Sequence, residues 1–170
     1  MPKRVDTRVD ARRAAVLEMV ARYLPVREQP PGSNRSPEID VWLRAVGSPL
    51  GSPWCSAFLY GCGREALGER WPFHRSGRVQ DLVDVCRGQQ RTSPVAHAEP
   101  GDLIAFYFTK LGRYAHIAIL RSKSATTIWT TDGNSIADGA VGDVREGWGV
   151  FEKQRPISGR MLALTWPKEA

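Results

Sequence analysis

The sequence is short of the features that mark several large classes of protein. Its three cysteines are an odd number at irregular spacing, which argues against a disulfide framework. No apolar run approaches the length needed to span a bilayer, and the charged start MPKRVDTRVDARRA lacks the apolar segment of a secretory signal. We therefore predict a protein that is made in the cytoplasm without a signal peptide and does not insert into membranes.

Motifs for four common kinds of site are also missing. The chain contains neither GxSxG nor GxxxxGKS/T, the signatures of serine hydrolases and of phosphate-binding loops. Its three cysteines and three histidines show none of the paired spacings of a zinc site, and no loop is rich in aspartate as a calcium site requires. The sequence thus predicts neither a metal nor a cofactor.

Positive charge is in modest excess. The 24 lysines and arginines outnumber the 18 acidic residues and give a formal net charge of +6. Such a charge suits polyanionic partners, namely nucleic acid, an anionic membrane or an acidic cell-wall polymer. The arginines are spread along the chain rather than gathered in a tract, so an ordinary solvated basic surface explains the excess equally well.

The composition is that of one soluble globular domain. With 170 residues, of which 42% are hydrophobic and 25% charged, the chain can bury a core without disulfides. No repeat, low-complexity tract or long linker divides it. We predict a single domain over 1–170, with the N-terminal helix and loop of 1–35 integral to it, and expect a monomer.

Helical and strand patterns occupy different halves of the chain. Apolar residues at helical spacing predict helices over 8–24, 37–46, 53–67 and 78–87. Short β-branched or aromatic runs between turn residues predict strands over 101–109, 114–121, 126–134, 147–155 and 159–166. Runs of helices followed by runs of strands predict an α+β domain, with the helices packed on one face of an antiparallel sheet.

One cysteine falls at a predicted helix start, in GSPWCSAFLYGCG. Ser52 suits the N-cap and Pro53 the first turn, which places Cys55 where free backbone N–H groups and the helix dipole stabilise a thiolate. The same N–H groups could bind an oxyanion. A small buried residue is the alternative for Cys55, and on apolar helix faces it is the interpretation of Cys62 and Cys86.

A thiol nucleophile needs a base, and one histidine lies on a rigid element. His74 and His97 fall in predicted loops and are interpreted as surface residues. His116 lies inside the strand YAHIAILR, where alternation groups it with Tyr114 and Leu120 on one face. Either a structural histidine or a general base fits this position.

The next predicted strand ends in a polar pair. Asp132 and Asn134 are two residues apart in TTIWTTDGN, so they share a face while the backbone stays extended. Either side chain could accept the proton on the imidazole nitrogen that points away from the thiol. A plain turn is the alternative interpretation of DGNS.

Together these segments resemble the CHAP family of cysteine, histidine-dependent amidohydrolases and peptidases, papain-like peptidoglycan hydrolases related to the NlpC group. The resembling runs are PWCSAF, EPGDLIAF, YAHIAIL, TTDGNS and GWGVFEKQRPIS, and the match extends from REQPPGSNRSPEID onward. The resemblance implies that Cys55 is the nucleophile and His116 the base. Where the family has Glu-x-Asn, this chain has Asp132-Gly133-Asn134, and the resemblance slightly favours Asp132 as the residue that orients the imidazole.

The resemblance also implies a papain-like core and a substrate. Bacterial peptidoglycan would be cut at an amide, by an endopeptidase or an N-acetylmuramoyl-L-alanine amidase such as a phage endolysin. The enzyme would act on the wall, in the periplasm or from outside, after holin-type release or injection. Trp54 beside the nucleophile, and Glu28 and Asn34 in the preceding loop, are predicted to contact substrate.

Two other classes of function are compatible with the sequence. An injected antibacterial amidase effector, or a thiol hydrolase of protein amides, would use the same residues on another route or substrate. A basic nucleic-acid-binding module would use the positive charge and some of the six tryptophans to stack bases. We assign Trp42, Trp129 and Trp166 to the core, and we expect no nucleic-acid partner.

Overall fold

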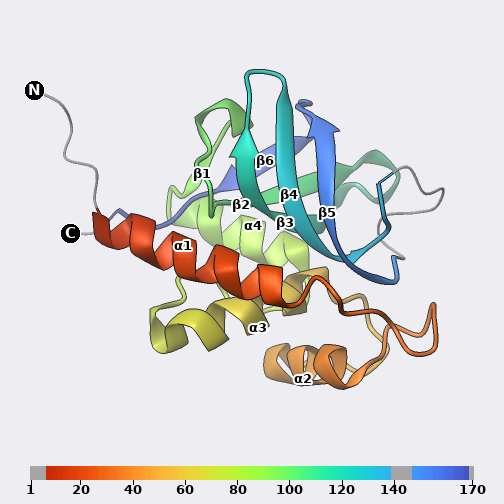
Figure 1. Ribbon diagram of the computed structural model, residues 1–170. Coiled ribbons are helices and arrows are strands. Elements are labelled where there is room, and N and C mark those ends of the chain that lie inside the picture. The colour runs from red at the N-terminus through yellow and green to blue at the C-terminus, as the bar shows by residue number, and fades with distance from the viewer. Residues whose placement is uncertain (1–6, 139–146, 169–170) are drawn as a thin grey trace, which may run out of the picture.

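The computed structural model describes residues 7–138 and 147–168, with side chains from Ala11 onward (Figure 1). It confirms an α+β domain in which helices precede a six-stranded antiparallel sheet. Its four α-helices are α1 (Thr7–Arg22), α2 (Pro37–Val46), α3 (Cys55–Leu67) and α4 (Val79–Gly88), with short 3-10 turns η1 (Gly68–Arg70), η2 (Val95–His97) and η3 (Thr109–Leu111).

The sheet has the strand order β1-β6-β2-β3-β4-β5, and every neighbouring pair is antiparallel. Its strands are β1 (Thr92–Ser93), β2 (Leu103–Phe108), β3 (Arg113–Lys123), β4 (Thr127–Ser135), β5 (Gly149–Pro156) and β6 (Met161–Leu164). The sequence prediction missed β1, because two residues are too few to show an alternating pattern. The long central strands β3 and β4 carry the residues of interest.

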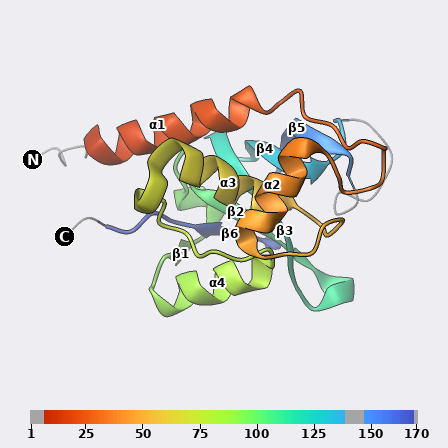
Figure 2. The same ribbon diagram turned by 90° about the horizontal axis from the view of Figure 1, so that it is seen from below.

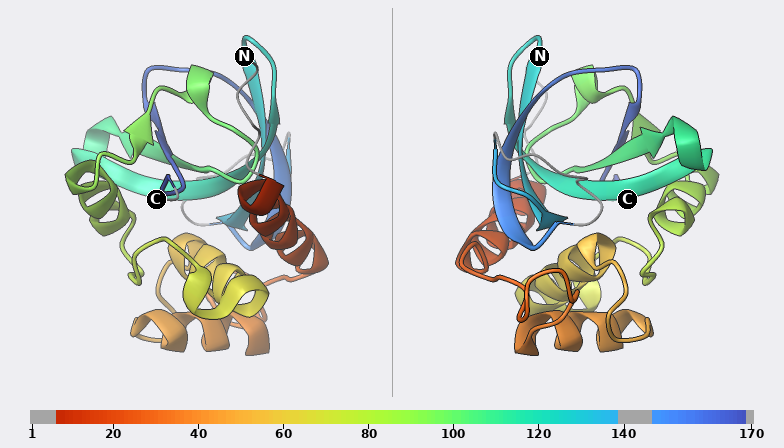
Figure 3. Two further views of the ribbon diagram at one scale, coloured as in Figure 1. Left: turned by 90° about the vertical axis from the view of Figure 1, so that its left-hand side faces the viewer. Right: turned by 90° about the vertical axis from the view of Figure 1, so that its right-hand side faces the viewer.

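Helices cover one face of the sheet, and the core lies between them. Figure 2, seen from below, shows α1, α3 and α4 in front of the strands, and α2 packs against α3. Alternate strand residues such as Ile117 and Ile119 join the large hydrophobic cluster between the sheet and the helices. Ile104 and Leu120 point the other way and form a smaller cluster on the opposite face of the sheet, which is strongly curved (Figure 3).

The helix α2 begins at a side-chain cap, whereas α3 begins without one. At α2 the Ser36 hydroxyl accepts the Ile39 amide at 3.1 Å, and Gly47 ends the helix in the left-handed region at φ 74°, as predicted. At α3 the predicted cap is wrong. The Ser52 hydroxyl instead donates to the Pro49 carbonyl at 2.6 Å, so the helix begins only at Cys55.

A buried ion pair attaches α1 to the rest of the domain. Arg13 donates to an Asp102 carboxylate oxygen at 2.7 Å and to the Pro100 carbonyl at 3.1 Å. The other Asp102 oxygen accepts the Glu99 amide at 2.9 Å. The turn that opens the EPGDLIAF segment is therefore a structural anchor for α1. This contact is a sufficient reason for an aspartate at position 102.

The length and hydropathy of the helices bear on membrane association. Among the helices of the described chain, none has both the length and the apolar character needed to cross a bilayer.

Candidate active site

Cys55 is the first residue of α3, and its side chain reaches a cleft. The thiol is 4% exposed and contributes to the lining of a cleft of about 510 Å³. The walls of the cleft come from the end of α2, the loop before α3, the start of α4 and the start of β3. The Ser56 hydroxyl donates to the Ser76 carbonyl at 2.7 Å and so ties the start of α3 to the opposite wall. The thiol therefore has a fixed position at a surface opening.

His116 links this thiol to a carboxylate. Its Nε2 lies 2.7 Å from Oδ2 of Asp132, and both side chains are almost fully buried. The Cys55 thiol lies beside the same ring. The other ring nitrogen, Nδ1, is buried and makes no hydrogen bond of normal geometry, so it is the nitrogen available to the thiol. The three residues form the row that thiol catalysis requires.

The charges in this row favour an imidazolium. Burial alone lowers the pKa of His116, but the interactions of the ring with Asp132 and with the neighbouring Cys55 outweigh it and raise the pKa to about 9. Burial raises the pKa of Asp132, and this effect is outweighed by the positive charges of Arg155 and His116 and by hydrogen bonds from both. The net result is a lowered pKa. The carboxylate is thus held ionised against the ring.

Arg155, on β5, holds the carboxylate that His116 contacts. Its Nη2 donates to Asp132 Oδ2 at 2.6 Å, while Nη1 donates to the Thr130 hydroxyl at 2.9 Å and approaches Asp132 Oδ1 at 3.3 Å. The Thr130 hydroxyl donates to Oδ1 at 2.5 Å. A two-pronged arginine contact fixes both the charge and the plane of a carboxylate.

Phe106 completes the surroundings of the His116 ring. It pairs with His116 across β2 and β3, and the two ring centroids are 5.5 Å apart. The Arg155 guanidinium lies over the Phe106 ring, 4.7 Å from its centroid. The imidazole therefore lies between an aromatic ring and a carboxylate that is itself anchored.

Sequence reasoning did not single out Arg155, Thr130 or Phe106. Their proximity depends on which residues of β4 and β5 face each other, and that register cannot be read from either strand alone. A usable signal exists in GVFEKQRP, where alternation puts Phe151, Lys153 and Arg155 on one face. Two basic residues on the less exposed face of a strand call for acidic or carbonyl partners.

A bulge on β3 overturns the predicted grouping of His116 with Tyr114. The pairing with β2 shifts between Phe106 and Tyr107, so that Ala115 has no partner opposite. As a result Tyr114 packs with the helix-side cluster, whereas Leu120 lies in the cluster on the other face. Simple alternation fails here because the extra residue turns the strand just before the histidine.

A second irregularity separates Asp132 from Asn134. The β4–β5 pairing shifts between Asp132 and Ser135, and Asn134 has a left-handed φ of 51°. The extended backbone on which their shared face depended is therefore absent. Asp132 makes the contact with His116, and Asn134 is buried at the irregular end of the strand.

The glycine between these residues brings β4 close to α3, the helix that carries Cys55. A Cβ placed on Gly133 would lie 2.7 Å from the Phe58 ring on α3. No real Cβ tolerates such a contact with a packed aromatic ring, so only glycine allows this approach. Gly133 therefore sets the distance between the Cys55 helix and the Asp132 strand.

The three predicted substrate contacts do not line the Cys55 cleft. Trp54 is fully buried, and its indole Nε1 donates to the buried Glu28 carboxylate at 2.9 Å. The indole also stacks on Trp42, with centroids 5.9 Å apart. Asn34 donates from Nδ2 to the Gly51 carbonyl at 3.0 Å. Trp54 and Glu28 are thus buried beside the start of α3 and support it from within the core.

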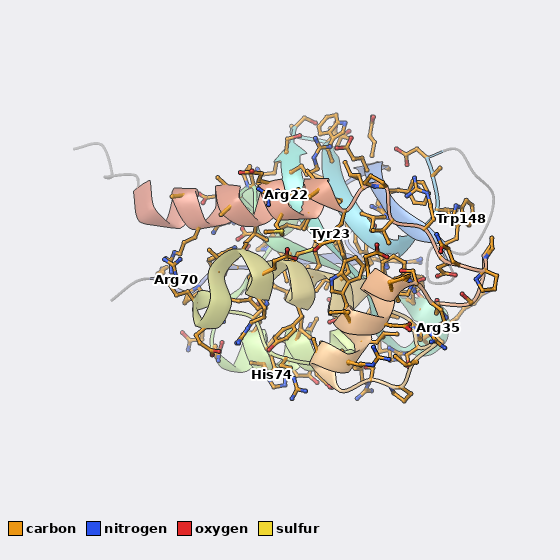
Figure 4. The ribbon with its side chains drawn as sticks, turned by 60° about the horizontal axis from the view of Figure 1, so that its bottom comes forward. Arg22, Tyr23, Arg35, Arg70, His74 and Trp148 are labelled. Carbon is orange, nitrogen blue, oxygen red and sulfur yellow. The ribbon has the colours of Figure 1, made fainter. Side chains whose placement is uncertain are left out.

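The remaining histidines are placed as predicted. His74 and His97 are exposed, and Figure 4 shows His74 at the outer edge of the molecule. Within 7–138 and 147–168, the structure shows no group of three or more His, Cys, Asp or Glu side chains that could hold a metal ion.

Comparisons with protein-family models, with curated proteins and with solved structures found no match to this chain. The functional assignment therefore depends on the residues and their geometry.

The raised pKa of His116 predicts a specific pH dependence of stability. Because the folded pKa of about 9 exceeds the ordinary 6.5, protonation of this ring stabilises the fold fully below pH 6.5. This contribution is lost as the pH rises from 6.5 to about 9, with a magnitude on the order of 3 kcal/mol. Asp132 acts in the opposite sense, since its stabilisation is present above its ordinary pKa and is lost only in strong acid.

Urea unfolding of the parent and of His116→Gln at pH 6, 8 and 10 measures this effect. We expect the free energy of unfolding of the parent to fall more steeply than that of the variant. NMR titration of the ring should give a midpoint near 9, with the exposed His74 as a reference signal in the same spectrum. Parallel curves for both proteins would contradict the assignment of a charged His116.

Proposed function

We propose that this protein is a cysteine amidohydrolase or peptidase with a papain-like core that cleaves an amide bond of bacterial peptidoglycan. The observation that carries the proposal is the row of Cys55, His116 and Asp132, in which the thiol opens on a cleft and the carboxylate holds the far nitrogen of the imidazole. This is the arrangement by which a thiol attacks a carbonyl in acyl transfer.

In the first half-reaction His116 acts as the base and Cys55 as the nucleophile. His116 takes the proton of the Cys55 thiol as its sulfur attacks the carbonyl carbon of the amide. The negative charge that develops on the carbonyl oxygen lies near the first turn of α3, where backbone N–H groups lack acceptors within the helix. The imidazolium then gives its proton to the leaving amine, and the C–N bond breaks to leave a thioester on Cys55.

In the second half-reaction water replaces the amine. The neutral His116 ring takes a proton from the water, whose oxygen attacks the thioester carbonyl. Collapse of the intermediate releases a carboxylic acid and restores the thiol. Asp132, fixed by Arg155, keeps the imidazole in one tautomer through both steps.

Peptidoglycan is the substrate that the sequence favours. The runs around Cys55, His116 and Asn134 resemble CHAP peptidoglycan hydrolases, and a net charge of +6 attracts the enzyme to an anionic wall. A phage endolysin that reaches the wall after holin-type release fits this reading. Within the proposal, an endopeptidase cuts the stem or cross-bridge, and an amidase cuts between the sugar lactyl group and L-alanine.

Dye release from purified, dye-labelled sacculi tests this function. We expect soluble dye from the parent, and none after Cys55 has been blocked with iodoacetamide. A gel shift on DNA without dye release would favour the nucleic-acid-binding module instead. Hydrolysis of a protein substrate such as casein, again without dye release, would assign the same thiol site to protein amides.

A further inference from the structure

Two arginines line the same cleft as the proposed nucleophile. Arg78 lies directly before α4 and Arg113 opens β3, and both contribute to the walls of the 510 Å³ cleft that contains Cys55. Figure 2 shows the two segments converging beside the end of α2. The other polar side chains of the lining are the serines Ser48, Ser52 and Ser76. The lining therefore carries two positive charges, and no acidic residue is among the described residues that form it.

Neither guanidinium makes a short hydrogen bond within the described part of the chain. Arg113 is half-buried, and its hydrogen bond within the described chain is a long one to the Tyr114 carbonyl, at 3.5 Å. Arg78 has a long and exposed contact of 3.4 Å with Asp81, which already accepts the Ser76 hydroxyl at 2.7 Å. Exposed ion pairs of this kind contribute little, so Arg78 remains able to bind a second anion.

We propose that Arg78 and Arg113 bind a carboxylate of the substrate, so that the enzyme prefers amides that have a free carboxylate nearby. This inference rests on the proposed function and deepens it. Guanidinium groups match the planar, two-oxygen geometry of a carboxylate. Cys55 and the two arginines line one cleft of about 510 Å³, a volume typical of a pocket for a small ligand. The bound carboxylate therefore belongs to a residue adjacent to the scissile carbonyl, as in an acidic peptide.

Alkylation of Cys55 tests the anion site without any peptidoglycan. Iodoacetate carries a carboxylate and iodoacetamide a neutral amide, yet both alkylate the same sulfur. The rate constant for iodoacetate divided by that for iodoacetamide, measured by intact-protein mass spectrometry at low salt, reports how strongly the cleft attracts the anion. We expect Arg78→Gln and Arg113→Gln each to lower the ratio roughly threefold, and the double variant roughly tenfold.

Arg121→Gln is the matched control. Arg121 lies on the same strand as Arg113, pairs with Glu152 at 3.0 Å and stands outside the cleft. The change removes the same net charge, so an unchanged ratio in this variant shows that position rather than total charge matters. An unchanged ratio in the double variant, with Cys55 still alkylated, would overturn the carboxylate site.

Sacculi whose carboxylates have been converted to methylamides separate this inference from the proposed function. The parent is expected to cut them about tenfold more slowly than native sacculi, and the double variant is expected to show a smaller difference. Equal rates of the parent on both substrates would overturn the preference for a carboxylate. Failure of the parent on native sacculi would reject the peptidoglycan substrate, while the alkylation ratio would still decide whether the cleft binds an anion.

Discussion

Replacing Cys55 with alanine is expected to lower the initial rate of dye release from sacculi by roughly 10⁴-fold or more, because the group that forms the covalent bond is removed. The fold should remain, since the change deletes one small side chain and costs about 1 kcal/mol of stability. Circular dichroism and the unfolding midpoint verify the fold in the same preparation. Release at the parental rate would contradict the catalytic role of Cys55.

Cys62 and Cys86 provide the matched controls for this substitution. Both thiols are buried, at 0% and 1% exposure, and burial raises the pKa of each. Cys62→Ala and Cys86→Ala should therefore lower stability by about 1 kcal/mol through lost packing and leave dye release intact. The comparison separates loss of a nucleophile from loss of a core atom.

Asp132→Asn is expected to produce the second-largest loss, a fall of roughly 10² to 10⁴-fold in kcat. The amide removes the negative charge that raises the pKa of His116 and holds one tautomer. The alkaline limit of the pH–rate profile should therefore move to lower pH, because the imidazolium loses its proton earlier. A merely structural role for Asp132 would lower stability without moving the pH profile.

Arg155→Met tests the anchor of this carboxylate by the same profile. Without the guanidinium, Asp132 shares its charge with His116 alone, so the pKa of His116 should rise while kcat falls through looser positioning. Arg121→Met, at an exposed ion pair, is the control and should change neither the pKa of His116 nor kcat.

Asn134→Gly tests the second residue of the polar pair. Glycine suits the positive φ of this position better than alanine does, and the change should affect kcat less than Asp132→Asn.

The sequence contained most of the elements of the fold but not their register. Ser36 and Gly47 bound α2 as expected because caps act over three or four residues. The helix with Cys55 and the strand with His116 were also predictable from local periodicity. The bulge at Ala115 and the left-handed Asn134 were not, because each depends on how a strand pairs with its neighbours.

The candidate site shows the same division. A cysteine at a helix start, a histidine inside a strand and an aspartate at a strand end are residue types with known roles in catalysis, so the sequence could single them out. Arg155 is one of many arginines, and its role exists only because β5 runs beside β4. The sequence could not place Trp54, because a tryptophan next to Cys55 is equally suited to a cleft and to a core. Its buried hydrogen bond to Glu28 decides for the core.

Digestion of purified sacculi in water enriched in ¹⁸O, followed by mass spectrometry of the soluble fragments, tests the central claim most directly. Thiol hydrolysis of an amide must place one water oxygen in the new carboxyl group and free one amine at the same bond. We predict fragments with a labelled carboxyl end and its matching amine, formed by the parent and absent with Cys55→Ala. Fragments with new sugar ends and no labelled carboxyl, or no fragments at all, would contradict the proposed function.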